Sequence, residues 1–279
     1  MRNFFKKYLA NLILVLILVS GLGIVLYPSV SNYINSKHQS KAIDNYSKQL
    51  ANVKPADFEK FWKEAEAFNK RLADQKTSFE VTDKTLAEYN KLLDPTQTGI
   101  MGYLEIENIG VNLPIYHGVE ETTLAVGIGH LPGSSLPTGG ESTHTVLSGH
   151  RGLPSSKLLT DLDQMIVGDV FLVHVMDKTF AYQVDQINIV LPDETSLLSV
   201  SKGEDYCTLV TCTPYGVNTH RLLVRGKRIE YESQNSIIVA DAVRFTPVMV
   251  APFIAAPILF VAFLIALIRT SSKGTGTRG

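Results

Sequence analysis

The chain contains little cysteine and has almost no excess of charge of one sign. Two of its 279 residues are cysteine, and 26 basic residues balance 27 acidic ones to a formal net charge of -1. A near-neutral chain without a sustained basic stripe excludes nucleic acid from its predicted partners. No internal repeat is visible in the sequence. With 45% hydrophobic residues, the chain has enough apolar material for one core of ordinary size.

The two cysteines do not form a pattern for a disulfide or a metal site. Cys207 and Cys212 lie in one β-prone stretch, so an extended strand would hold them about 16 Å apart on opposite faces. We therefore predict two free thiols, with Cys207 packed in the core. A metal site of Cys212, His150 and either His144 or His220 is an alternative, but no CxxC or HxxxH spacing supports it. We predict neither a metal nor a cofactor.

Two long apolar runs lie near the ends of the chain. Residues 9–27 have only Asn11 and Ser20 as polar interruptions, and residues 247–268 form a second run. Either run can cross about 30 Å of hydrocarbon as a helix. Basic residues precede the first run and follow the second, so the positive-inside rule places both termini in the cytoplasm and the rest outside. A cleaved signal peptide is the alternative for the first run.

The segment between the first apolar run and residue 100 has a helical pattern. Its apolar residues Phe58, Phe61, Trp62, Ala65 and Phe68 recur at near-helical spacing, which predicts one or two amphipathic helices. We expect this stripe to pack against the domain that follows rather than to bind a substrate or cofactor.

From about residue 101 the pattern changes to short β-prone stretches separated by Gly, Pro and Asn. The stretches are 102–106, 111–116, 143–148, 170–175, 180–190, 206–212 and 221–229, with brief helices expected near 120–126 and 155–162. Such spacing predicts a mainly β, mostly antiparallel barrel. The predicted organisation is a cytoplasmic N-terminus (1–8), a transmembrane helix (9–30), an extracytoplasmic helical segment with a lid candidate (31–100), the barrel (101–232), a linker (233–245), a second transmembrane helix (246–268) and a basic cytoplasmic tail (269–279).

Cys212 ends an apolar β-prone stretch and is followed by a turn and a returning strand. The turn contains Pro214 and Gly216, and Arg221 lies in the return. A cysteine attacks as its thiolate, so a nucleophilic one needs positive charge or a base nearby. A hairpin-like return can bring Arg221 beside Cys212 and supply that charge. The alternative is a buried strand cysteine that acts as a small hydrophobe.

His150 also ends a short apolar strand, and glycines at 149 and 152 flank it. It is therefore predicted to be accessible at a strand terminus. Imidazole is the usual partner of a cysteine nucleophile because it moves protons near neutral pH. A solvated or structural loop histidine is the alternative.

These segments resemble the sortase family. The phrases TCTPYGVNTHRLLVRGKR (211–228) and GHLPGSSLPTGGESTHTVLSGHRGLPSSKLLTDLD (129–163) are similar to those of class C, pilin-polymerising sortases, over a region from about residue 101 to about residue 229. The resemblance implies the family's eight-stranded barrel and a sortase-type cysteine transpeptidase, an enzyme related in chemistry to cysteine endopeptidases. It also implies that Cys212 is the nucleophile that forms a thioacyl intermediate. His150 would be the general acid–base, and Arg221 would stabilise the oxyanion or hold the substrate.

The resemblance further implies the substrates and the location. The partners would be secreted proteins with LPxTG-like sorting signals, joined through a lysine of another pilin subunit during pilus assembly, and the lipid bilayer. The location would be a Gram-positive-type cell membrane, with two spans and the catalytic domain outside. A housekeeping sortase that joins proteins to cell-wall precursor is the alternative enzyme, and a catalytically silent scaffold is the alternative outside the enzyme class. The oligomeric state is left open.

Three further residues are candidates for the site. Thr211 precedes Cys212 and can orient the substrate or Arg221, against the alternative of an ordinary strand residue. His144 can share a strand face with His150, although a structural polar residue is the alternative. Asp94, in Asp94-Pro95-Thr96, is the lid candidate by resemblance to the Asp-Pro-aromatic lids of class C sortases. Since the aromatic residue is missing, a turn is the alternative.

Overall fold

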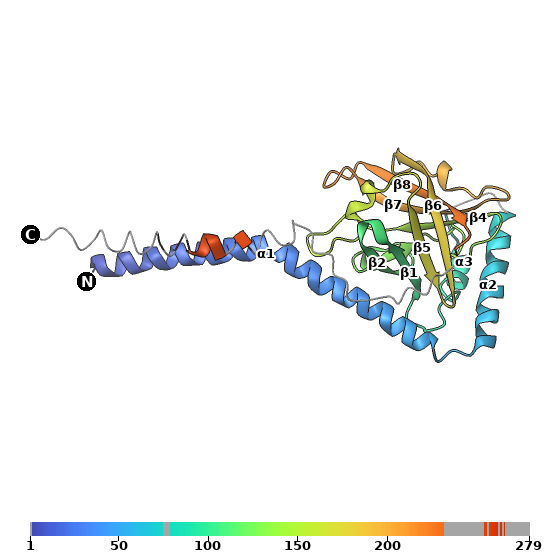
Figure 1. Ribbon diagram of the computed structural model, residues 1–279, viewed down its shortest axis with the longest axis horizontal. Helices are drawn as coiled ribbons and strands as arrows, with labels where there is room; N and C mark the ends of the chain where they lie inside the picture. Colours follow the sequence, from blue (N-terminus) through green and yellow to red (C-terminus); the bar gives the residue numbers. More distant parts are fainter. Residues whose placement is uncertain are drawn as a thin grey trace, which may run out of the picture. The chain divides into compact units, whose positions relative to one another are not determined.

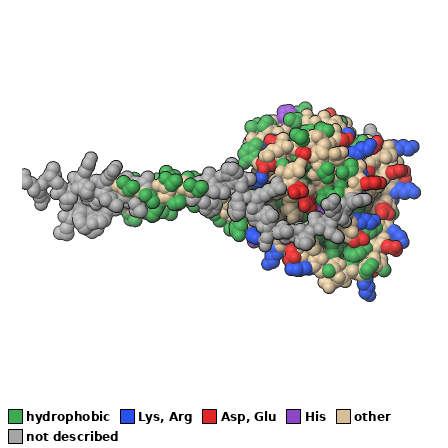
Figure 2. Space-filling model, in the orientation of Figure 1, with side chains coloured by type: hydrophobic (Ala, Val, Ile, Leu, Met, Phe, Trp, Pro, Cys, Tyr) green, Lys and Arg blue, Asp and Glu red, His purple; other side chains and the backbone are tan. Residues whose placement is uncertain are grey.

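The computed structural model describes residues 2–74 and 79–231, with short helical pieces at 254–255, 257–261, 263 and 265. The chain divides into two compact units, Met1–Tyr33 with Asp241–Gly279, and Ile34–Ala240. Figure 2 shows basic and acidic side chains interspersed over the visible face of the second unit, and apolar side chains along the helix of the first.

The first unit contains most of one long apolar helix. Helix α1 (Arg2–Leu50) starts in this unit and ends in the second, with Pro28 inside it. In the described part of the chain, Leu12–Leu50 is the one helix long and apolar enough to cross a membrane. Its apolar side chains are exposed in the protein, as Leu16, Ile17 and Ile24 illustrate, and lipid would remove them from water. The helix is therefore a candidate membrane anchor. The second predicted span, 246–268, lies largely outside the described residues.

The second unit is built around a closed β-barrel (Figure 1). Its strands within residues 79–231 are β1 (Ile100–Ile106), β2 (Val111–His117), β3 (Ile128–His130), β4 (Thr143–Ser148), β5 (Val170–Val175), β6 (Lys178–Val190), β7 (Asp205–Thr213) and β8 (His220–Ile229). They close in the order β1-β2-β3-β4-β7-β8-β6-β5. The β2–β3 and β4–β7 pairs are parallel and the others are antiparallel, which confirms the predicted mostly antiparallel barrel.

The short helix α3 (Asp83–Tyr89) precedes β1. Helix α4 (Glu121–Leu124) and the 3-10 turns η1 (Glu107–Ile109), η2 (Thr160–Gln164) and η3 (Ser196–Leu198) connect the strands. The brief helix predicted near 120–126 is α4. The helix predicted over 155–162 is wrong, since only the later turn η2 forms there. Leu158 has a positive φ of 43°, which a right-handed helix does not allow.

Helix α2 (Pro55–Ala73) packs against the barrel through the predicted aromatic stripe. Trp62, Ala65 and Phe68 are buried in the same cluster as the barrel core. The Trp62 ring meets Phe180 edge to face at 5.9 Å between centroids, and its Nε1 donates to Asp177 Oδ1 at 2.8 Å. The stripe is therefore a packing surface, as predicted.

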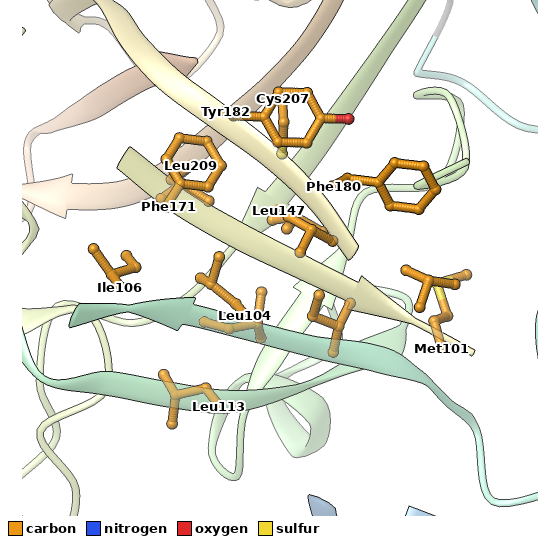
Figure 3. Close-up of a cluster of buried hydrophobic side chains, with 14 of the residues drawn as sticks. Met101, Leu104, Ile106, Leu113, Leu147, Phe171, Phe180, Tyr182, Cys207 and Leu209 are labelled. Atoms are coloured by element: carbon orange, nitrogen blue, oxygen red, sulfur yellow. The ribbon is translucent and has the colours of Figure 1, made fainter. Parts of the chain in front are cut away.

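The barrel interior and its outer wall carry separate apolar clusters. Inward side chains, including Leu104, Leu147 and Leu209, fill the interior together with Cys207 (Figure 3). Cys207 is fully buried, and both cysteines are free thiols, as predicted. On the other face, Val146, Val210, Leu223 and Leu198 form a second cluster. Because side chains alternate along a strand, Cys212 belongs to the outer face with Val210.

Candidate active site

Strands β7 and β8 place Cys212 and Arg221 directly opposite each other. The two residues are Cα partners in the antiparallel ladder. Opposed residues share a face, with Cβ atoms about 5 Å apart. The Arg221 Nη1 donates to the His220 carbonyl at 3.1 Å, which holds the guanidinium against the backbone of the turn. Cys212 is half-buried, so its thiol is accessible while Cys207 is enclosed.

Strands β4 and β7 bring the segment before His150 next to the strand that carries Cys212. Their parallel ladder runs to the pair Ser148 and Val210. It is prolonged by a hydrogen bond of 3.0 Å from the Gly149 N–H to the Val210 carbonyl. His150 is two residues beyond Ser148, as Cys212 is two beyond Val210. Neighbouring strands lie about 4.8 Å apart, so a continuation of this register past the end of β4 would bring His150 to the side of Cys212.

Glu121 of helix α4 reaches the His150 ring. The His150 Nε2 atom lies 3.2 Å from Glu121 Oε1, and the His150 side chain is 23% exposed. Sequence reasoning missed this contact, because the only available signal was an acidic residue in a predicted short helix. The carboxylate can orient the ring.

Thr211 lies on the face of β7 opposite to Cys212. It is buried, and its hydroxyl donates to the Gly149 carbonyl at 2.7 Å. Thr211 therefore contacts the segment that carries His150 rather than the surface that carries Cys212.

His144 lies at the other end of β4 from His150. Strand β4 ends at Ser148, and His150 lies six residues after His144, which is about 20 Å along an extended chain. The ring is buried, with Nδ1 2.9 Å from the Ser199 carbonyl and Nε2 2.7 Å from Thr208 Oγ1. Burial lowers the pKa of His144. The structure does not bring this residue to Cys212.

Asp94 closes a turn ahead of β1. Its carboxylate accepts the N–H groups of Thr98 at 3.0 Å and Gly99 at 3.1 Å. The Gly99 carbonyl accepts a hydrogen bond from the N–H of His117, at the C-terminal end of β2. Because β2 is parallel to β3 and β3 is antiparallel to β4, this end of β2 lies at the opposite rim from the ends of β4 and β7. The geometry is that of a turn residue.

A different aromatic residue packs near the site. Phe79, in the segment between α2 and α3, packs against the outer-face cluster that includes Val210 and Leu223. These two residues precede Cys212 and follow Arg221 by two positions, on the same face. No group of three or more His, Cys, Asp or Glu side chains suited to a metal occurs in the part of the chain that the structure describes.

Comparison with known proteins agrees with this architecture. The model of the Sortase domain matches residues 104–229. Sortase D of Bacillus subtilis is 31% identical over 144 residues, which cover 50% of this chain and 70% of that protein. Sortase A of Streptococcus agalactiae is 27% identical over 244 residues, covering 85% of this chain and 90% of that protein.

Solved structures give higher identities. Sortase C1 from Streptococcus agalactiae has a TM-score of 0.68 at 48% identity, covering 69% of this chain and 100% of that one. Sortase C of Streptococcus pneumoniae has a TM-score of 0.63 at 46% identity, covering 68% of this chain and 97% of that one. The fold and these relatives define a cysteine transpeptidase, and the chain belongs to the sortase family. Among sortases it is similar to those of class C.

Proposed function

We propose that Cys212, His150 and Arg221 are the nucleophile, the general acid–base and the oxyanion-binding residue of this transpeptidase. The observation that carries the proposal is the register of three adjacent strands. The β7–β8 ladder pairs Arg221 with Cys212, and the β4–β7 pairing, prolonged by Gly149, supports a position of His150 beside the thiol. This register supports a site in which thiol, imidazole and guanidinium share one accessible face.

The reaction divides one amide exchange into two acyl transfers. The Cys212 thiolate attacks the threonine carbonyl of an LPxTG-like signal, and the C–N bond to the next residue breaks. His150 gives its proton to the departing amine, which leaves a thioester on Cys212. An incoming amine then attacks the thioester and loses a proton to His150, which restores the thiolate. Arg221 donates charge-assisted hydrogen bonds to the oxyanion in both steps.

Similarity to class C sortases supports pilin subunits as the substrates. One solved relative, sortase C of Clostridium perfringens at 42% identity, was determined with the C-terminal cell wall sorting motif. Another, from Streptococcus pneumoniae, is described in terms of pilin substrate specificity. We propose that the acceptor here is a pilin lysine, so that the product is an isopeptide-linked polymer.

The membrane arrangement follows from the two apolar runs. Helix α1 would anchor the enzyme, and residues 246–268 would form a second span. The basic residues before the first run and after the second support cytoplasmic termini and an extracytoplasmic barrel at a Gram-positive-type surface. In this arrangement the barrel faces exported substrates.

Of the remaining candidates, Thr211 is proposed to support the His150 segment through its bond to Gly149. His144 has its ring nitrogens engaged inside the fold, and Asp94 caps a turn, so neither placement supports a role in substrate binding or as a lid.

Co-expression of the full chain with secreted proteins that carry LPxTG-like signals tests the function. Detergent-resistant ladders of high mass should appear, vanish with Cys212→Ala and persist with Cys207→Ala. Single attachments to cell-wall precursor without ladders would indicate a housekeeping sortase. Ladders that persist in Cys212→Ala would overturn the assignment of the nucleophile.

A further inference from the structure

Arg151, the residue directly after His150, is buried between the ends of two strands. Its side chain is 8% exposed. The Nη1 atom donates to Thr213 Oγ1 at 2.6 Å, and Nη2 pairs with the Asp163 carboxylate of η2. Since Thr213 directly follows Cys212, the guanidinium joins the segment of the proposed acid–base to the segment of the proposed nucleophile.

This bond is one of two that flank Cys212. On one side, Thr211 donates to the Gly149 carbonyl, and on the other side Thr213 accepts from Arg151. Thr211 and Thr213 alternate with Cys212 and lie on the opposite face of β7. The paired residues of the β4–β7 ladder end at Ser148 and Val210. Beyond the backbone bond from the Gly149 N–H to the Val210 carbonyl, these two side-chain hydrogen bonds link the strand ends.

The chemistry of Arg151 argues against a role as a second cation for the thiolate. Asp163 already pairs with its charge, and Nη1 is directed to a neutral hydroxyl. The Arg151 Nε is buried and has no hydrogen-bond partner among the described residues. An ion pair whose carboxylate is 47% exposed, and whose cation has an orphan donor, is a poor source of stability. The planar guanidinium group does, however, hold two hydrogen-bond partners at a defined separation.

We propose that Arg151 is a positioning residue, which joins Asp163 and Thr213 so that the ends of β4 and β7 keep His150 beside Cys212. This inference rests on the proposed roles of Cys212 and His150. A shift of about 1 Å in reacting groups can cost about 100-fold in rate. Arg151 would therefore govern turnover rather than substrate affinity.

The test uses the full chain in detergent micelles, with an internally quenched peptide containing Leu-Pro-Glu-Thr-Gly and hydroxylamine as the acceptor. Arg151→Ala should lower kcat by about 10- to 100-fold and change KM by less than about threefold. Thr213→Val, which removes the acceptor oxygen, should lower kcat in the same way. The double variant should be no slower than Arg151→Ala alone, because both changes break one bond. Thr213→Ser keeps the oxygen and should recover most of the loss.

Arg225→Ala is the matched control. Arg225 forms a two-point ion pair with Asp185, at 3.0 and 2.7 Å, elsewhere on β8. Its loss should lower the Tm and leave kcat unchanged, which separates a positioning effect from general destabilisation.

The outcomes distinguish this inference from the proposed function. Turnover that persists in Cys212→Ala would overturn the function itself. An inactive Cys212→Ala together with a folded Arg151→Ala of wild-type kcat would overturn only the positioning role, as would additive losses in the double variant. If Arg151→Ala does not fold, equal kcat values for Thr213→Val and Thr213→Ser would overturn it instead.

Discussion

Arg221 lies directly across the β7–β8 ladder from Cys212, and the same ladder continues without a register shift back to Tyr206 and Lys227. The placement of the two backbone positions is therefore determined by a long run of strand pairs rather than by the conformation of the turn alone. A site held in this way needs little reorganisation when charge develops on a substrate.

Replacement of Arg221 by Lys tests whether the planar guanidinium geometry contributes to oxyanion stabilisation. Lysine keeps the charge but lacks the second coplanar donor, so Arg221→Lys should lower kcat/KM by about 100-fold. The matched control is Arg225→Lys, four residues further along the same face of β8 and paired with Asp185. We expect it to retain wild-type kcat/KM in the peptide assay. Similar activity in the two variants would show that charge alone suffices at position 221.

The two cysteines should differ in reactivity. Cys212 is half-buried, whereas Cys207 is fully buried and its pKa is raised well above the ordinary thiol value, first by burial and then by Asp205. Iodoacetamide should therefore add one group to the native chain, at Cys212, and a second only after unfolding. Intact mass and peptide mapping measure this. Cys207→Ala should leave native labelling unchanged, and rapid native labelling of Cys207 would contradict the burial argument.

Local sequence signals predicted the elements that neighbouring residues determine. The β-prone stretch ending at Cys212, the turn after it and the returning strand with Arg221 are contiguous, so their pairing follows from the chain order. Strand β3 was missed, because three residues, Ile128–His130, are too few to show a period of two.

Contacts between distant segments could not be predicted in the same way. The proposed pairing of His150 with Cys212 depends on the parallel ladder of β4 with β7, two strands about 60 residues apart in the chain. The contacts of Glu121 with His150 and of Arg151 with Thr213 depend on how α4 and the loop after β4 fold against the barrel. The sequence identified His150 as an accessible histidine at a strand end, and the family resemblance gave it a catalytic role. Residue periodicity alone could not have connected it to the thiol.

Helix α2 should stabilise the barrel unit through Trp62. The ring is 5% exposed, packs against Phe180 and donates to Asp177. Trp62→Ala should lower the free energy of unfolding by about 3–5 kcal/mol, measured by urea denaturation. Trp62→Phe keeps a ring and loses the hydrogen bond, so it should cost about 1 kcal/mol. A loss below about 1 kcal/mol for Trp62→Ala would show that α2 contributes little to the fold.

A buried histidine makes the stability of the barrel unit dependent on pH. His130 is fully buried, with Nε2 2.8 Å from the Ser135 carbonyl and Nδ1 3.0 Å from the Tyr89 hydroxyl. Burial lowers the pKa of His130 to about 4, against an ordinary value near 6.5. Between these values the unfolded chain binds a proton that the folded chain does not. Stability must therefore fall as the pH drops from about 6.5 to about 4, by about 3 kcal/mol in all from this residue.

Urea denaturation of the wild type and His130→Gln between pH 7 and pH 4.5 isolates this effect. Glutamine does not titrate and can still form hydrogen bonds, so the variant should lose stability less steeply with falling pH, whatever its stability at pH 7. His144 is also buried with a lowered pKa, so His144→Gln should flatten the profile in the same direction. The titration of carboxylates contributes equally to the pH dependence of the wild type and both variants, so it cancels in the comparison. Parallel profiles for the wild type and His130→Gln would mean that the folded protein takes up the proton at His130 as readily as the unfolded chain does.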